Sequence, residues 1–175
     1  MARVVVGLDV SPQSREALRI ATHEARWRSA TLEAVHVFQV GEVEDIDPLA
    51  GAAAMSAPTA AGGAPAGSAT REAFQRTTQQ IDEARQEAKS RLQRIVGEAG
   101  DALNGVSVEY TVITDQHPAE ALVKLSENAD LLVVGSRGLG GFKGLLLGSV
   151  SLQCVLYATV PVLVVRPRLH GSPVQ

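Results

Sequence analysis

Gly135, Gly138, Gly148 and Ser149 have the types and the spacing that a phosphate-binding loop needs. They follow the apolar run 131–134, which is typical of a buried parallel strand. Because glycine has no Cβ, the chain can turn tightly there and present its N–H groups to an anion. A helix beginning after Gly148 would add the N–H groups and positive dipole end of its first turn. The pattern predicts an anion or nucleotide site; the alternative is a glycine-rich surface loop with Ser149 as an ordinary N-cap.

Two familiar phosphate motifs do not occur in this sequence. The chain has no Gly-Lys-Ser/Thr, so the loop is not a Walker A loop. The stretch 138–143 places Lys143 where the dinucleotide fingerprint has its third glycine. The spacing alone therefore predicts a phosphate-bearing ligand without naming it.

Composition favours an α/β protein with an aliphatic core. Of the 175 residues, 45% are apolar but only 3% are aromatic, which suits a parallel sheet covered by Ala-rich helices. The net charge of −3 gives no general attraction to nucleic acids or anionic membranes. The N-terminus has no signal peptide, and no stretch is long enough to span a membrane. We therefore expect a cytoplasmic protein that binds neither nucleic acid nor membrane.

Strand-like and helix-like stretches alternate along the chain. The expected strands are residues 3–9, 31–40, 106–113, 130–135 and 159–165, and the expected helices are residues 12–29, 71–99, 117–128 and 148–158. The helix 71–99 carries an apolar stripe that we expect to face the sheet. The alternation predicts right-handed crossovers and a parallel sheet.

Residues 51–67 carry no charge and no regular period, and they are rich in Ala, Gly and Pro. We expect a flexible connection there, with a functional lid as the alternative. The chain is then one domain over residues 1–167, with a flexible insertion at 41–70 and a frayed tail at 168–175. The acidic residues just before 51–67 suit a solvated loop better than a metal site. The single cysteine, Cys154, suits a core position better than a nucleophile, and it excludes an intrachain disulfide.

Asp9 ends the first expected strand, and Gly135 ends the fourth. In an open α/β sheet, ligands bind beyond the carboxyl ends of the strands, where the strand order reverses. If these two strands are neighbours, the acid and the glycine loop face one crevice, where a carboxylate suits ribose hydroxyls. The alternative is that Asp9 supports the following turn with Ser11; both roles can coexist.

With these residues in place, the chain resembles the ATP-binding branch of the universal stress protein family. Gly135, Gly138, Gly148 and Ser149 match the family signature without gaps. The resemblance also takes in VVVGLDVSPQSREAL at the start, AVHVF, HPAEALVKLSENADLLVVGSRG and the closing PVLVVRP. It covers nearly everything except residues 41–70 and the tail. The chain departs from the family in the insertion after the second strand and at Gln116, where many members have glycine.

The resemblance implies an open five-stranded parallel sheet of Rossmann-like order 3-2-1-4-5 with helices on both faces. It also implies a homodimer through the fifth strand and one ATP per subunit. Carried over residue by residue, the nucleotide-binding positions are Gly7, Asp9, Val37, Val134, Gly135, Gly138, Gly148, Ser149, Val150 and Ser151. Asp9 resembles the ribose contact, and Val37 the residue whose backbone meets adenine. Arg137 is not a motif position, but its charge can assist phosphate binding.

The function implied is an ATP-binding stress protein that acts as a regulatory or sensor module, with Mg²⁺ held mainly by phosphate oxygens. No catalytic residue and no protein metal ligand is assigned. One alternative is a slow ATP hydrolase or phosphotransferase, which would need a positioned base. His36 and His117 are candidates, although structural roles suit them better. AMP or cyclic AMP remains an alternative ligand, because the adenine and ribose contacts would be the same.

Overall fold

The computed structural model describes residues 2–9, 11–38, 68–138 and 146–166. In chain order the elements are β1 (Arg3–Gly7), α1 (Pro12–Trp27), β2 (Thr31–Phe38), α3 (Ser68–Gly97), a short 3-10 helix (Gly100–Leu103), β3 (Val108–Thr114), α4 (Pro118–Ser126), β4 (Leu131–Gly135), α5 (Ser149–Tyr157) and β5 (Val162–Val165). The expectations for residues 41–67, for Lys143 and for the tail fall outside the described residues.

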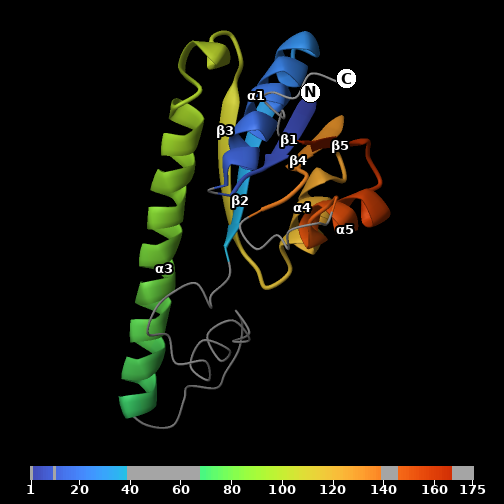
Figure 1. Ribbon diagram of the computed structural model, residues 1–175. Helices are drawn as coiled ribbons and strands as arrows, with labels where there is room; N and C mark the ends of the chain where they lie inside the picture. Colours follow the sequence, from blue (N-terminus) through green and yellow to red (C-terminus); the bar gives the residue numbers. More distant parts are fainter. Residues whose placement is uncertain (1, 10, 39–67, 139–145, 167–175) are drawn as a thin grey trace, which may run out of the picture.

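The strands form one sheet in the order β3-β2-β1-β4-β5 (Figure 1). Every neighbouring pair is parallel. This confirms the five-stranded order and places β1 beside β4, so the carboxyl ends of these two strands lie together. The strand order reverses at this point, which is where ligands bind in open α/β sheets.

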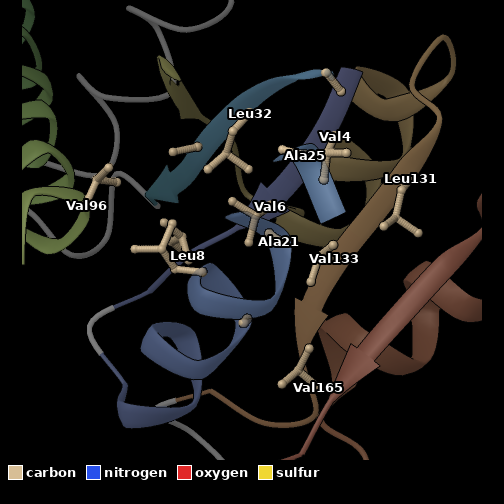
Figure 2. Packing of buried hydrophobic residues seen from close by; sticks show 14 of the residues in the cluster. Val4, Val6, Leu8, Ala21, Ala25, Leu32, Val96, Leu131, Val133 and Val165 are labelled. Atoms are coloured by element: carbon tan, nitrogen blue, oxygen red, sulfur yellow. The ribbon is translucent and has the colours of Figure 1, made fainter. Parts of the chain in front are cut away.

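One face of the sheet is covered by α1 and α3. Ala17, Leu18, Ala21 and Ala25 form the buried stripe of α1, and Leu92 and Val96 anchor the C-terminal half of α3. Figure 2 shows Ala21 and Ala25 of α1 among Val4, Val6 and Val133 of the sheet, with Val96 of α3 in the same cluster. The C-terminal part of the apolar stripe of α3 therefore faces the sheet as expected. Figure 1 shows α3 alongside β3 and extending past the end of the sheet.

The opposite face is covered by α4 and α5. Ala119 and Leu122 from α4 and Cys154 from α5 pack on Val5, Val35, Leu132 and Val134. Helices therefore lie on both faces, as the resemblance implied. The carboxylate of Glu33 is buried in this aliphatic layer, where it pairs with Arg3 at 2.8 Å and accepts a hydrogen bond from Thr111 at 2.7 Å. Its charge is therefore compensated.

Several element ends differ from the sequence prediction. The first strand ends at Gly7, two residues early, because Asp9 belongs to the turn that starts α1. The last strand starts at Val162 and not at 159, although the Pro161 carbonyl still accepts a hydrogen bond from Leu132 N. Helix α3 starts at Ser68, so residues 68–70 of the expected insertion are helical. No helix among the described residues has the length and apolar character needed to cross a bilayer.

Candidate functional site

Asp9 is held in place by the first turn of α1. Its Oδ1 accepts hydrogen bonds from Ser11 N at 3.0 Å and from the hydroxyls of Ser11 and Ser14. Its backbone N–H donates to Ser14 Oγ at 2.7 Å. Ser11 is in turn the N-cap of α1, since its side chain accepts from Ser14 N. Asp9 thus supports the turn through its Oδ1, as the alternative prediction had it.

Gly138 brings the loop after β4 against Asp9. A Cβ added at Gly138 would lie 2.5 Å from Asp9 Oδ2, a distance that no real contact tolerates. The carboxylate could not swing away easily, because its other oxygen is held by three donors. The acid and the glycine loop therefore lie in close contact, and glycine is needed at 138 for this approach.

The two ends of the glycine loop are tied together beside α5. Gly148 N donates to Ser136 O at 2.7 Å, and Ser136 N donates to Val165 O at 2.7 Å, which joins the loop to the sheet. Ser151, 3% exposed, has its hydroxyl 3.0 Å from both Ser136 O and Gly148 O. These bonds fix where the loop leaves the sheet and where it returns.

Helix α5 begins beside these hydrogen bonds, and no side chain caps its N-terminus. Gly148 is the N-cap residue and offers no side-chain acceptor. The first backbone bond that α5 receives is Leu152 N to Gly148 O at 2.9 Å. The N–H groups of Ser149, Val150 and Ser151 come before it and donate to no described residue. Unpaired N–H groups at a helix start, together with the helix dipole, attract anions.

The remaining predicted positions differ in what surrounds them. The missing Cβ of Gly7 makes room for Leu122, since a Cβ there would lie 2.9 Å from Leu122 Cδ1; packing alone therefore calls for glycine at this position. Val134 is a core residue, so only its backbone can meet a ligand. Val37 lies two residues past Val35, the β2 partner of Gly7, at the same edge of the sheet. A Cβ on Gly135 would lie 3.3 Å from Arg137 O, so this turn is tight as well.

The two candidate bases have other roles or positions. The His36 Nδ1 lies 2.8 Å from the Leu8 carbonyl, which can only accept, so the proton is on Nδ1. His117 lies before α4, and its Nδ1 is 3.8 Å from an Asp115 carboxylate oxygen.

Cys154 is fully buried, and burial raises the pKa of its thiol to about 11, as a core cysteine requires. Among the described residues, no group of three or more acidic, His or Cys side chains could hold a metal ion.

Sequence reasoning missed Ser14 and Ser136. Ser14 contributes a hydroxyl that clamps Asp9, and its signal is the spacing of three residues from the N-cap Ser11. Ser136 contributes only its backbone, through its carbonyl and N–H. Backbone roles leave no mark on residue type, so the sequence carried no signal for Ser136.

Comparison with known proteins finds relatives in sequence and in fold. Universal stress protein Rv2005c of Mycobacterium tuberculosis is 34% identical over 165 residues, which are 94% of this chain and 45% of that protein. The chain thus spans about half the length of the curated relatives it matches. Hypothetical protein MJ0577 superposes with a TM-score of 0.67 at 21% identity, over 95% of this chain and 96% of its own. A universal stress protein solved in complex with cAMP superposes with a TM-score of 0.52 at 25% identity, over 94% and 96% of the two chains.

The family-level match extends over the whole described structure. The pattern of the universal stress protein family fits residues 1–166, from the start of β1 past the end of β5. The matched region includes the Asp9 turn, the close approach of Gly138 and the open start of α5. The chain therefore belongs to the universal stress protein family.

Proposed function

We propose that this protein is a cytoplasmic adenine-nucleotide-binding module, with ATP as its ligand, that serves a regulatory or sensor role. The observation that carries the proposal is the junction of Asp9, Gly138 and the open start of α5. A carboxylate suited to ribose lies beside a backbone suited to phosphate. The cAMP complex of a related protein at 25% identity supports an adenine nucleotide as the ligand class.

In this proposal the triphosphate lies along the loop from Gly135 to the first turn of α5. The N–H groups of Ser149, Val150 and Ser151 would donate to phosphate oxygens, and Arg137 would add a positive charge nearby. Mg²⁺ would be held mainly by the phosphate oxygens. Asp9 Oδ2 would accept a ribose hydroxyl, and the backbone of Val37 would meet adenine. Nucleotide occupancy would then shift the conformation or the surface that a partner reads.

Calorimetric titration with ATP, AMP and cyclic AMP tests the proposal. Gly138→Ala should lower ATP affinity by about tenfold or more, because its Cβ would displace the Asp9 carboxylate. Gly97→Ala is the matched control, since a Cβ on Gly97 meets nothing within 4 Å. Equal ATP affinity for the wild type and a folded Gly138→Ala variant would exclude this site. A preference for cyclic AMP over ATP would replace ATP as the ligand and retain the site.

We also propose that two copies associate through β5. This strand is an edge of the sheet, and all four of its residues are apolar. An uncovered apolar edge is an aggregation hazard, and antiparallel pairing with the same strand of a second copy would cover it. Helix α5 beside β5 adds an exposed apolar surface formed by Leu152, Val155, Leu156 and Tyr157.

Sedimentation equilibrium at tens of micromolar tests this association. Leu156 is 63% exposed, so Leu156→Lys should leave the monomer folded and shift the protein toward monomer. Trp27→Lys, at a residue 80% exposed on α1, is the control for loss of an exposed apolar side chain elsewhere. A wild-type protein that is monomeric at these concentrations would refute the proposed dimer.

A further inference from the structure

A hollow that is partly lined by Asp9 opens between the start of α1 and the last turns of α3. Its volume is about 230 Å³, and its lining residues are Asp9, Ser11, Arg15, Arg91, Arg94, Ile95 and Glu98. We call it the arginine groove. Asp9 and Ser11 line it beside the start of α1, and the last turns of α3 line it from the other helix. Asp9 therefore lines this groove and also lies against Gly138.

The charges in the arginine groove favour an anion. Three guanidinium groups line it against two carboxylates, those of Asp9 and Glu98. Glu98 is already paired with Arg15, at 3.1 Å. The Asp9 carboxylate is partly compensated by the Ser11 and Ser14 donors on its Oδ1. The carboxylates are thus largely engaged before any ligand arrives.

Arg91 and Arg94 supply the positive charge that remains. They are three residues apart on α3, so they lie on neighbouring positions of one helix face. Arg91 pairs with Glu87 at 3.0 Å, but the two side chains are 49% and 71% exposed, which makes this ion pair weak. Arg94 makes no hydrogen bond or ion pair with any other described residue. Guanidinium groups in a concave site bind phosphate oxygens in a bidentate manner.

The position of the groove restricts what can carry this anion. If Asp9 Oδ2 accepts one ribose hydroxyl, a substituent on the adjacent hydroxyl lies next to Asp9. The arginine groove, which Asp9 also lines, is a hollow next to that position. In the proposed binding mode the 5′-phosphates would lie along the glycine loop toward α5. A single nucleotide would then place one phosphate group in the groove and the other on the glycine loop.

We infer that the arginine groove receives a phosphate attached to the 2′- or 3′-hydroxyl of the bound nucleotide. The ligand class is then an adenosine nucleotide phosphorylated at both the 5′ position and a second ribose hydroxyl. This inference rests on the proposed nucleotide function. It assigns Arg94 and Arg91 as phosphate contacts and Glu98 as an opposing charge.

The test compares the binding of AMP with that of adenosine 2′,5′-bisphosphate and adenosine 3′,5′-bisphosphate by calorimetry. One of the bisphosphates should bind about tenfold more tightly than AMP, the scale of one added charge-assisted contact. Arg94→Gln should remove this gain while AMP affinity stays the same. Glu98→Gln should enlarge the gain, because it removes a negative charge from the groove. Lys89→Gln is the matched control, since it removes an exposed cation from α3 outside the groove.

Each outcome decides between the two proposals. If AMP and ATP bind but neither bisphosphate binds more tightly than AMP, the inference is wrong and the proposed function stands. A gain that Arg94→Gln leaves intact, or that Lys89→Gln removes equally, also overturns it. Binding of inorganic phosphate alone, with the same dependence on Arg94 and no gain for a bisphosphate, would make the groove a free-phosphate site. If no adenine nucleotide binds, both proposals fail.

Discussion

Helices α1 and α5 both begin at the carboxyl edge of the sheet, yet only α1 has an N-terminus capped by a side chain. At the start of α1, Ser11 caps the helix, and Asp9 and Ser14 bond to each other beside it. At its end, Ser29 adopts a left-handed conformation with φ of 51°, and Ala30 N donates back to Ala25 O. Backbone polar groups at both ends of α1 thus have hydrogen-bond partners within the molecule.

Helix α5 is incomplete in two places. Its N-cap Gly148 offers no side-chain acceptor, and much of its outer surface is apolar and exposed. It is held to the body mainly through Cys154 and the Ser151 hydroxyl, which are buried. The difference indicates that α1 serves to hold Asp9 in position, whereas α5 presents groups that a ligand or a second subunit would meet.

The largest expected effect comes from giving α5 an N-cap side chain of the kind that α1 already has. Gly148→Asp would place a carboxylate over the first-turn N–H groups, and its Cβ would meet Arg137 Cα at an ordinary 3.4 Å. Helix stability should rise, by up to about 1 kcal/mol. ATP affinity should fall by about a hundredfold, because the carboxylate competes with phosphate for the same donors. Calorimetry and urea unfolding measure the two effects.

Gly148→Ala distinguishes the effect of the added carboxylate on ATP binding from the effect of the added Cβ. It adds the same Cβ without an acceptor, so it should bind ATP much better than Gly148→Asp does. If the two variants bind ATP equally well, the open start of α5 is not where phosphate binds.

The attachment of α5 to the core should depend on pH. Burial raises the pKa of Cys154 from 9.0 to about 11, so the unfolded thiol ionises before the folded one. Its contribution to stability is therefore complete below about pH 9 and is lost as the pH rises toward 11, by about 2 kcal/mol. Urea unfolding at pH 8 and pH 11 should show a larger loss for the wild type than for Cys154→Ala. An equal loss in both would contradict burial of the thiol.

Removing the N-cap of α1 should lower the stability by less than ionisation of the Cys154 thiol does. Ser11→Ala removes the N-cap and one donor to Asp9, so stability should fall by about 1 kcal/mol. Nucleotide affinity should fall as well if Asp9 must be held in place to meet ribose. Ser90→Ala is the control, because this exposed serine only bonds back to Gln86 O within α3. A variant as stable as the wild type would show that water replaces the cap.

The smallest effect is expected at the other end of α1. Ser29→Gly should raise the stability by about 0.5–1 kcal/mol, because glycine adopts the left-handed conformation without the Cβ penalty. Thermal unfolding would detect the gain, and nucleotide affinity should not change. A decrease in stability would mean that the unfolded-state entropy of glycine outweighs the relief of strain.

Local patterns predicted most of the elements because each pattern is carried by neighbouring residues. The four-residue apolar run before Gly135 became the core of β4, and the stripe of Ala17, Leu18, Ala21 and Ala25 became the buried face of α1. Element ends were less predictable. β1 stops at Gly7 because two serines of the next helix take Asp9 into a turn, and this competition does not show in the strand pattern.

The sequence alone determined the parallel α/β class, the glycine spacing and the buried character of Cys154, because these depend on residue type and period. The neighbouring positions of β1 and β4, which bring Asp9 against Gly138, came from the sequence only through the family resemblance. Tertiary structure decided that Gly7 makes room for Leu122 and that the Ser136 carbonyl ties the loop to Gly148. It also decided that Arg91 and Arg94 of α3, which are far from Asp9 along the chain, line a groove together with it. Such contacts arise only when the sheet brings distant segments together, since no periodicity within one segment encodes its distance from another.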